Sequence, residues 1–277
     1  MADSDMSAAM TRALRVTVSA GLLALLLAGC ASTRELADKR LDPLLPADAI
    51  LLGEQHDAQA HREVQRAIVQ ALASRGQLAA LVLEMAERGR STSGLGRDAN
   101  AAQVRSALHW DTSGWPWKTY APVVMAAVRR GVPVLGANLP REALRATMND
   151  TALDTHLAAA ALERQREAIR VGHCNLLPPE RLMPMVRVQL ARDASMARAV
   201  VEAGVPGKTV LLIAGGGHIL RDVGIPTHLP KDWRVRSVLA VAGVPPESAR
   251  TDADLVWQTA ALAPRDHCAQ LRDQFSG

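Results

Sequence analysis

The stretch "AILLGEQHD" (residues 49–57) decides the fold, because its character changes in the middle. An apolar run ends at Gly53, and the polar residues Glu54 and His56 follow almost at once. A short apolar run bounded in this way is typical of a buried β-strand. In open α/β sheets, ligands bind at the carboxyl ends of the strands. The stretch therefore predicts a buried strand with one wall of a functional site at its end.

Strands and helices alternate outward from this stretch. Residues 60–72 place apolar side chains on one helical face, and "LAALVLEM" (78–85) is a second buried strand. A helix is expected over residues 121–131, followed by a third strand in "VPVLGANLPR" (132–141). Three further strands are expected in residues 208–220, 233–243 and 253–260. This alternation predicts an α/β fold with a mostly parallel central sheet flanked by helices and a helical insertion at about 141–204.

The composition is that of a globular protein without a nucleic-acid surface. Of the 277 residues, 48% are hydrophobic and 22% are charged, which is ample for a buried core. The formal net charge is only +4, and aromatic residues make up 3% of the chain. Binding of nucleic acid needs clustered cations or aromatic stacking platforms, so we expect no nucleic-acid partner.

Residues 1–29 have the features of a lipoprotein signal peptide. Arg12 and Arg15 precede an apolar segment that is shorter than the roughly 20 residues a transmembrane helix requires. The segment ends in "LAGC" (27–30), which resembles the lipobox of bacterial lipoproteins, in which Cys30 is acylated and becomes the mature N-terminus. The alternative is an ordinary signal peptide with an incidental cysteine.

Acyl chains on Cys30 tether a domain to a membrane surface, and residues 30–48 have the polar, proline-punctuated character of a tether. Ala31 is not an aspartate, which by the same resemblance favours the outer membrane. We therefore expect a lipid-anchored domain that faces the periplasm.

Export also affects the interpretation of the two remaining cysteines. Cys174 and Cys268 form an even pair in an oxidising compartment, so a disulfide between them is expected. Two free buried thiols are one alternative. The other is that Cys174 acts as a soft ligand beside His173.

Polar side chains follow three of the expected strands. Glu54 and His56 end the first strand, Glu84 ends the second, and His218 follows the glycines of "IAGGGH" (213–218). Two histidines and one or two carboxylates are a credible set of divalent-metal ligands, and the same groups could work in acid–base catalysis without a metal. Taken singly, each could instead be a helix cap, an ion-pair partner or a loop hydrogen bond. "AGGGH" matches neither phosphate-loop nor dinucleotide-binding patterns.

A second cluster lies in the helical part of the sequence. "LHWDTSGWPWKTYAP" (108–122) contains three of the five tryptophans and the only tyrosine, Tyr120. "VGHCNLLPPERLMPM" (171–185) adds His173, Cys174 and two methionines. Such crowding in an aromatic-poor chain indicates a flat apolar ligand or a partner surface, and the alternative is a plug that shields the helical layer. Tyrosine and histidine can each ligate haem iron.

These motifs, in this order along the chain, resemble the ChaN-like haem-binding lipoproteins of the Tiki superfamily, which is more distantly similar to the erythromycin esterases. The resemblance covers "ILLGEQHD", "LVLEM", the tryptophan segment ending in Tyr120, "VPVLGANLPR", "GHCNLLP", "QLARDASMA" and "LLIAGGGHILRDVGIPTHL". It implies a haem-binding α/β domain over residues 49–262, with the helical subdomain at about 141–204, and a C-terminal tail over 263–277.

The resemblance also implies a function. It indicates a protein that binds haem and takes part in haem and iron acquisition, with Tyr120 as the first choice of iron ligand and His173 as its helper. Haem between two subunits would make a haem-linked homodimer, and an outer-membrane haem receptor is a further implied partner.

The wider superfamily holds a divalent metal through residues that correspond here to His56, Glu84 and His218, with Glu54 beside them. The alternative function is therefore a metal-dependent hydrolase or protease with Zn, Mn or Co, in which Glu54 activates the water. One departure is that "GGGH" (215–218) lacks the polar residue that the family's motif usually has.

Overall fold

The computed structural model describes residues 35–275. The chain divides into two units, residues 1–43 and 44–277, and the fold given below is that of the second. The predicted signal peptide and Cys30 lie outside the described residues. None of the helices between residues 35 and 275 combines the length and the apolar character that a bilayer span requires.

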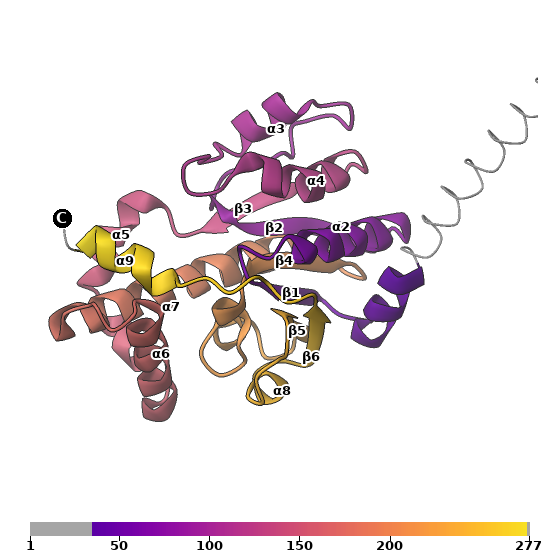
Figure 1. Cartoon of the computed structure of the whole chain (residues 1–277). Coiled ribbons are helices and arrows are strands. Elements are labelled where there is room, and N and C mark those ends of the chain that lie inside the picture. The colour runs from indigo at the N-terminus through magenta and orange to yellow at the C-terminus, as the bar shows by residue number, and fades with distance from the viewer. Residues whose placement is uncertain (1–34, 276–277) are drawn as a thin grey trace, which may run out of the picture. The chain divides into compact units, whose positions relative to one another are not determined.

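A parallel sheet of six strands forms the centre of the described fold (Figure 1). Its strand order is β3-β2-β4-β1-β5-β6. The strands are β1 (Ala49–Glu54), β2 (Leu78–Glu87), β3 (Val134–Asn138), β4 (Thr209–Gly215), β5 (Val235–Ala242) and β6 (Leu255–Thr259). This confirms the α/β fold with a central parallel sheet that the sequence predicts.

The central strands are buried on both faces. Every residue of β1 and of β4 is buried, as expected for parallel strands that read as continuous apolar runs. The two strands pair in register, so that Glu54 at the end of β1 lies opposite Gly215 at the end of β4. The pairing therefore brings the polar residues after β1 beside the glycine-rich segment after β4.

One face of the sheet is covered by α2 (Gln59–Ser74) and α4 (Trp117–Val128), with α3 (Ala101–Ala107) packed against α4. The apolar residues Ile68 and Leu72 of α2 are fully buried, but so are His61 and Gln65, which continue the same helical face. The polar end of α2 thus points toward the site, where its side chains find hydrogen-bond partners.

The predicted helical insertion forms the layer on the opposite face (Figure 1). Its long helix α7 (Pro179–Glu202) packs on β2, β3 and β4, and Met196 and Val200 share a core cluster with Leu51, Val82 and Leu212 of the strands. The shorter elements of this layer are η2 (Arg141–Ala143), α5 (Leu144–Met148), η3 (Thr151–Thr155) and α6 (Ala159–Gly172). The connecting elements of the second unit are η4 (Gly216–Ile219), η5 (Ile225–His228) and α8 (Ala249–Asp252), and η1 (Asp42–Leu44) lies at the boundary between the two units. The insertion is therefore part of the main fold.

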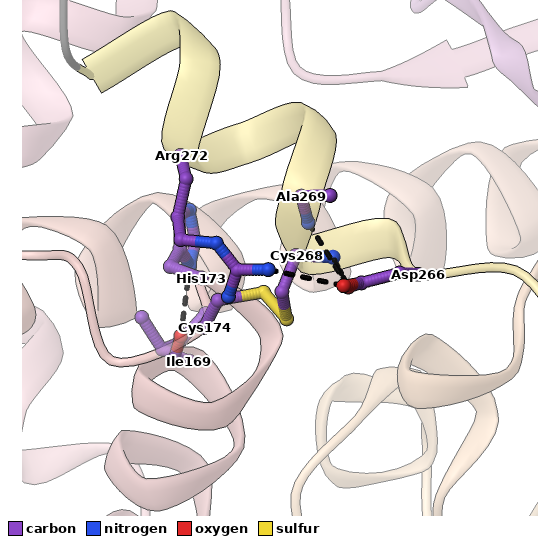
Figure 2. Close-up of a disulfide and its surroundings, with 7 residues drawn as sticks. All are labelled: Ile169, His173, Cys174, Asp266, Cys268, Ala269 and Arg272. Carbon is purple, nitrogen blue, oxygen red and sulfur yellow. Dashed lines mark hydrogen bonds and ion pairs between the residues drawn. A yellow bond between two sulfur atoms is a disulfide. The ribbon is translucent and has the colours of Figure 1, made fainter.

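A disulfide joins Cys174, at the end of α6, to Cys268 in the C-terminal helix α9 (His267–Phe275), across 94 residues of sequence (Figure 2). The segment that we predict as a tail, residues 263–277, thus contains a helix held to the helical layer by a covalent bond. His173 lies next to the disulfide, where its Nδ1 is 2.8 Å from the carbonyl oxygen of Ile169 (Figure 2).

Candidate functional site

The carboxylate of Glu54 is enclosed by hydrogen-bond donors from four directions. Tyr120 donates its hydroxyl to Oε1 at 2.7 Å, and His56 Nδ1 lies 2.8 Å from the same oxygen. Gln65 donates its amide to Oε2, and Arg62 Nη2 lies 3.7 Å from Oε1. Glu54 is only 2% exposed, so these contacts replace water around a buried charge.

A second buried network surrounds Glu84. The backbone N–H of Gly215 donates to Glu84 Oε2 at 2.7 Å, and His218 Nε2 lies 3.5 Å from Oε1. The other ring nitrogen of His218, Nδ1, lies 2.5 Å from Asp193 Oδ1. The imidazole is thereby held between two carboxylates.

Asp193 belongs to this network although the motifs did not single it out. It lies on α7, in register with the buried apolar residues Val186, Leu190, Ala197 and Val200. The spacing i, i+4, i+7, i+11, i+14 puts all five residues on one helical face. A charged residue on an otherwise apolar helical face is rarely buried without a partner, and this pattern in the sequence could have indicated that Asp193 belongs to a buried network.

The two networks meet at His56, whose Nε2 lies 3.9 Å from Glu84 Oε2. A Cβ added at Gly215 would come within 2.9 Å of His56 Nε2, so only glycine leaves room for this imidazole. The structure thus brings Glu54, His56, Glu84 and His218 together at the carboxyl edge of the sheet. Their role as metal ligands stays a prediction.

The charges in the second network are shifted strongly by burial and by one another. Burial alone would lower the pKa of His218, but the charges of Asp193 and Glu84 and their hydrogen bonds raise that pKa to about 10. Burial alone would raise the pKa of Glu84, yet the charge and hydrogen bond of His218 lower it to about 2. For Asp193, burial outweighs the attraction of His218 and raises its pKa to about 6. At neutral pH His218 is therefore a cation bound to Glu84.

Every carboxylate of the networks already accepts hydrogen bonds from protein groups. Within residues 35–275, no three His, Cys, Asp or Glu side chains are arranged as a group that could hold a metal ion. The metal-dependent hydrolase alternative, with Glu54 as its base, gains no support from this geometry.

Tyr120 and His173 occupy separate surroundings. Tyr120 belongs to α4 and is 2% exposed, and its ring lies near those of Trp110 and Trp115, at centroid distances of 5.7 and 6.0 Å. Burial and the charge of Glu54 raise the pKa of its phenol. His173 is half-buried beside the disulfide at the end of α6. The assignment of the two residues as haem ligands stays a prediction.

A cavity of about 480 Å³ opens beside the Glu84 network. It is lined by Glu84, Met85, Ala86, Glu87, Arg90, His109, Asp111, Gly114, Trp115, Asn138, Leu139, Arg141, Leu144 and Arg192. These residues come from the ends of β2 and β3 and the segments that follow them, from the tryptophan-containing loop before α4, and from η2, α5 and α7. Its volume is in the range of small-molecule and cofactor pockets.

The cavity combines arginines with apolar and aromatic side chains. Arg141 Nη2 forms an ion pair with Asp111 Oδ2 at 3.2 Å, whereas Arg192 Nε is buried without a hydrogen-bond partner among the described residues. Trp115 also contacts the imidazole of His56 edge-on, at a ring-centroid distance of 4.8 Å. The predicted strand-end residues and the predicted tryptophan cluster are therefore adjacent parts of one region.

Comparison with known proteins agrees with this architecture. The solved structure of ChaN of Campylobacter jejuni with cofacial haem matches with a TM-score of 0.66 and 27% identity, covering 79% of this chain and 90% of that one. A Bacillus cereus protein matches with a TM-score of 0.43 and 15% identity, covering 73% of this chain and 68% of that one. The type III effector HopBA1 matches with a TM-score of 0.40 and 14% identity, covering 78% of this chain and 88% of that one. Both matches are too distant to inform function. No curated protein sequence matches the chain.

A family model described as haem-binding uptake, Tiki superfamily, ChaN matches residues 41–229, which include the strands β1 to β4, the tryptophan segment and the "GGGH" motif. The match covers more than half of the chain and all the residues that line the cavity. The chain belongs to the ChaN family of haem-binding uptake proteins in the Tiki superfamily.

Proposed function

We propose that the protein binds haem in the cavity beside Glu84 and takes part in haem and iron acquisition. The observation that carries this proposal is the lining of the cavity, because haem is a flat apolar ring that carries two carboxylates. A site for haem therefore needs apolar walls together with cations. Both are present around one volume of about 480 Å³.

The cations are the more specific part of the fit. Arg90 in the loop after β2, Arg141 in η2 and Arg192 in α7 line the same space. A buried donor without a partner is costly, and Arg192 Nε is such a donor among the described residues. A carboxylate of the ligand would supply the missing acceptor and bind the guanidinium through charge-assisted hydrogen bonds.

The apolar walls suit the ring itself. Met85, Leu139 and Leu144 lie on the sheet and helical sides of the cavity, and Trp115 presents an aromatic ring from the loop. The three acidic residues on the lining are engaged within the protein: Glu84 is bound to His218, Asp111 is paired with Arg141, and Glu87 accepts a hydrogen bond from the backbone N–H of Arg141 at 3.0 Å. They leave Arg90 and Arg192 as the cations for a carboxylate ligand.

The anchoring and assembly are further parts of the proposal. We infer an outer-membrane lipoprotein that is acylated on Cys30, with its domain in the periplasm, from the lipobox-like "LAGC" (27–30). A haem-linked homodimer and an outer-membrane haem receptor are consistent with the ChaN family and with the cofacial haem of the Campylobacter jejuni protein.

Titration of the purified protein with haem, followed by the Soret band, tests the function. We expect saturable one-site binding that weakens at least tenfold in an Arg90→Gln, Arg192→Gln double variant, because each lost charge-assisted bond contributes about 1.5–3 kcal/mol. Arg198→Gln is the matched control, since Arg198 lies on the same helix as Arg192 but is exposed and does not line the cavity. Haem binding no stronger than that of an unrelated protein would refute the proposal.

A further inference from the structure

We infer that the amino-terminal edge of the sheet is a basic surface that docks on the anionic phospholipid headgroups of the membrane in which the chain is anchored. The inference rests on one part of the proposed function, the acylation of Cys30. The surface, called the basic edge below, is made of the segments that lead into β1 to β5. These segments are residues 44–48, 75–77, 129–133, 203–208 and 230–234, and their cations, all exposed, are Arg75, Arg129, Arg130, Lys208, Lys231 and Arg234.

Hydrogen bonds hold these segments side by side. The N–H of Thr209 donates to Gln77 O at 2.7 Å, which joins the segments before β4 and β2. The N–H of Asp48 donates to Arg234 O at 2.9 Å, which joins the segments before β1 and β5. The strand order β3-β2-β4-β1-β5 puts four spacings of about 4.8 Å between the outer two of these strands, so the basic edge is about 20 Å wide.

Positive charge is concentrated on the basic edge. Its six cations face two acids, Asp48 and Asp232, which leaves a net charge of +4, as large as that of the entire chain. Asp48 is neutralised by Arg234 Nη2 at 2.9 Å. Lys208 and Lys231 form no ion pair with an acidic side chain of residues 44–275. Their charges are therefore available to an anionic partner outside the domain.

The chain enters the domain at this same edge. Ala49 is the first residue of β1, and Cys30 is 18 residues upstream of Asp48, so a fully extended connection reaches at most about 60 Å. A tether of this length gives the domain a high effective concentration at the membrane surface. Val205, which is 45% exposed beside the cations, adds an apolar contact for the lipid interface.

An anionic headgroup layer is the partner that this chemistry fits. Lipid-anchored proteins commonly combine acyl chains with a basic patch, because the two attractions add. Lysine and arginine are drawn to anionic lipids within about one Debye length of the surface. Because the strands are parallel, docking of the basic edge turns the opposite edge, with Glu84 and the cavity, away from the membrane. The cavity then opens toward the aqueous side.

Lysine labelling of the acylated full chain on lipid vesicles tests the inference. Lys208 and Lys231 lie on the basic edge, whereas Lys118 is exposed at the start of α4, beside the carboxyl edge, and serves as an internal control. Vesicles of phosphatidylcholine are compared with vesicles of equal parts phosphatidylcholine and phosphatidylglycerol, using a water-soluble amine reagent and mass spectrometry. On the anionic vesicles we expect labelling at least about threefold slower at Lys208 and Lys231 but unchanged at Lys118. About 1 M salt should abolish this protection.

Charge reversal gives a second measurement that leaves the labelled lysines in place. An Arg129→Glu, Arg130→Glu variant should lose the protection of Lys208 and Lys231. An Arg105→Glu, Arg181→Glu variant is the matched control, since it changes two exposed arginines of α3 and α7 outside the basic edge and should keep the protection.

The outcomes separate the docking surface from the anchor. Equal labelling of Lys208 and Lys231 on both kinds of vesicle overturns the docking surface and leaves the acyl anchor intact. Protection that needs no anionic lipid and rises with the protein-to-lipid ratio indicates a second copy of the chain on this edge and also overturns the inference. A chain that stays on neither kind of vesicle overturns the anchor and the docking surface together, whereas the haem titration is unaffected by either result.

Discussion

His218 Nδ1 lies 2.5 Å from Asp193 Oδ1, although Asp193 belongs to α7 in the helical insertion and His218 belongs to η4, which follows β4. Both side chains are buried, and Glu84 contacts the other edge of the imidazole. A cation shared by two buried carboxylates links η4, directly after β4, with the carboxyl-terminal half of β2 and the middle of α7. This network fixes the floor beside the cavity in which we propose that haem binds.

Asp193→Asn is expected to destabilise the protein by about 3–5 kcal/mol, because it removes one partner of a buried ion pair and leaves the others in place. Chemical denaturation of the variant and the wild type measures this loss. Asp232→Asn is the control, since Asp232 is exposed. A loss in Asp193→Asn no larger than that in the control would contradict the structural role of the network.

The stability of the fold should fall as the pH rises from about 7 to 10. The pKa of His218 is raised from 6.5 to about 10 in the folded state. Its contribution to the stability of the fold is therefore complete below pH 6.5 and is lost as the pH rises through the pKa of the folded state. The folded state holds the proton more tightly, and a higher pH therefore favours unfolding, by at most about 1.4 kcal/mol per pH unit. The measurement is the free energy of unfolding against pH in chelator-containing buffer. His218→Gln should lack this alkaline slope.

Gly215→Ala should destabilise the protein by about 1–3 kcal/mol through overpacking, because the added Cβ would meet His56 Nε2 at 2.9 Å. Gly217→Ala is a matched control two residues away, where an added Cβ meets no atom within 4 Å. Thermal unfolding of the two variants should separate them clearly. Equal melting temperatures would show that His56 can move away without cost.

Reduction of the disulfide should free α9 more than it weakens the sheet. The bond closes a loop of 94 residues, but it tethers a terminal helix whose preceding segment, residues 261–266, is exposed. Hydrogen exchange should therefore accelerate in residues 267–275 of a Cys174→Ser, Cys268→Ser variant, while β1 and β4 keep the protection of the wild type. Faster exchange throughout the sheet would indicate that the bond stabilises the whole domain.

His109 follows α3 with a backbone φ of +45°, so His109→Gly should leave the free energy of unfolding within about 1 kcal/mol of the wild type, because glycine adopts a positive φ without steric cost. His109→Val should destabilise the protein by more than about 1 kcal/mol, since a β-branched residue is strained in this conformation. Denaturant unfolding of both variants without haem tests this difference. A His109→Val variant as stable as His109→Gly would mean that the backbone after α3 relaxes to another conformation.

The order of strands and helices follows from the sequence because it depends on local patterns. The continuous apolar runs of β1, β2 and β4 are typical of buried parallel strands, and each ends in polar residues or glycine. Those endings predict that Glu54, His56, Glu84 and His218 lie at one edge of the sheet, and the structure brings them together there. By contrast, the local pattern does not show where the helical insertion packs. In the structure it forms a layer against one face of the sheet, because the core residues of α7 pack directly on the strands.

By itself, the sequence determined the family, the strand ends that meet and the pair of cysteines, since motifs and periodicity are local properties. Only the tertiary structure decided which of these groups face one another. It pairs Asp193 with His218 and buries the hydroxyl of Tyr120 in a hydrogen bond to Glu54. It also forms a cavity that is lined by both His109 and Arg192. The reason is that a cavity and a buried ion pair depend on the packing of segments far apart in the chain, which a local pattern does not encode.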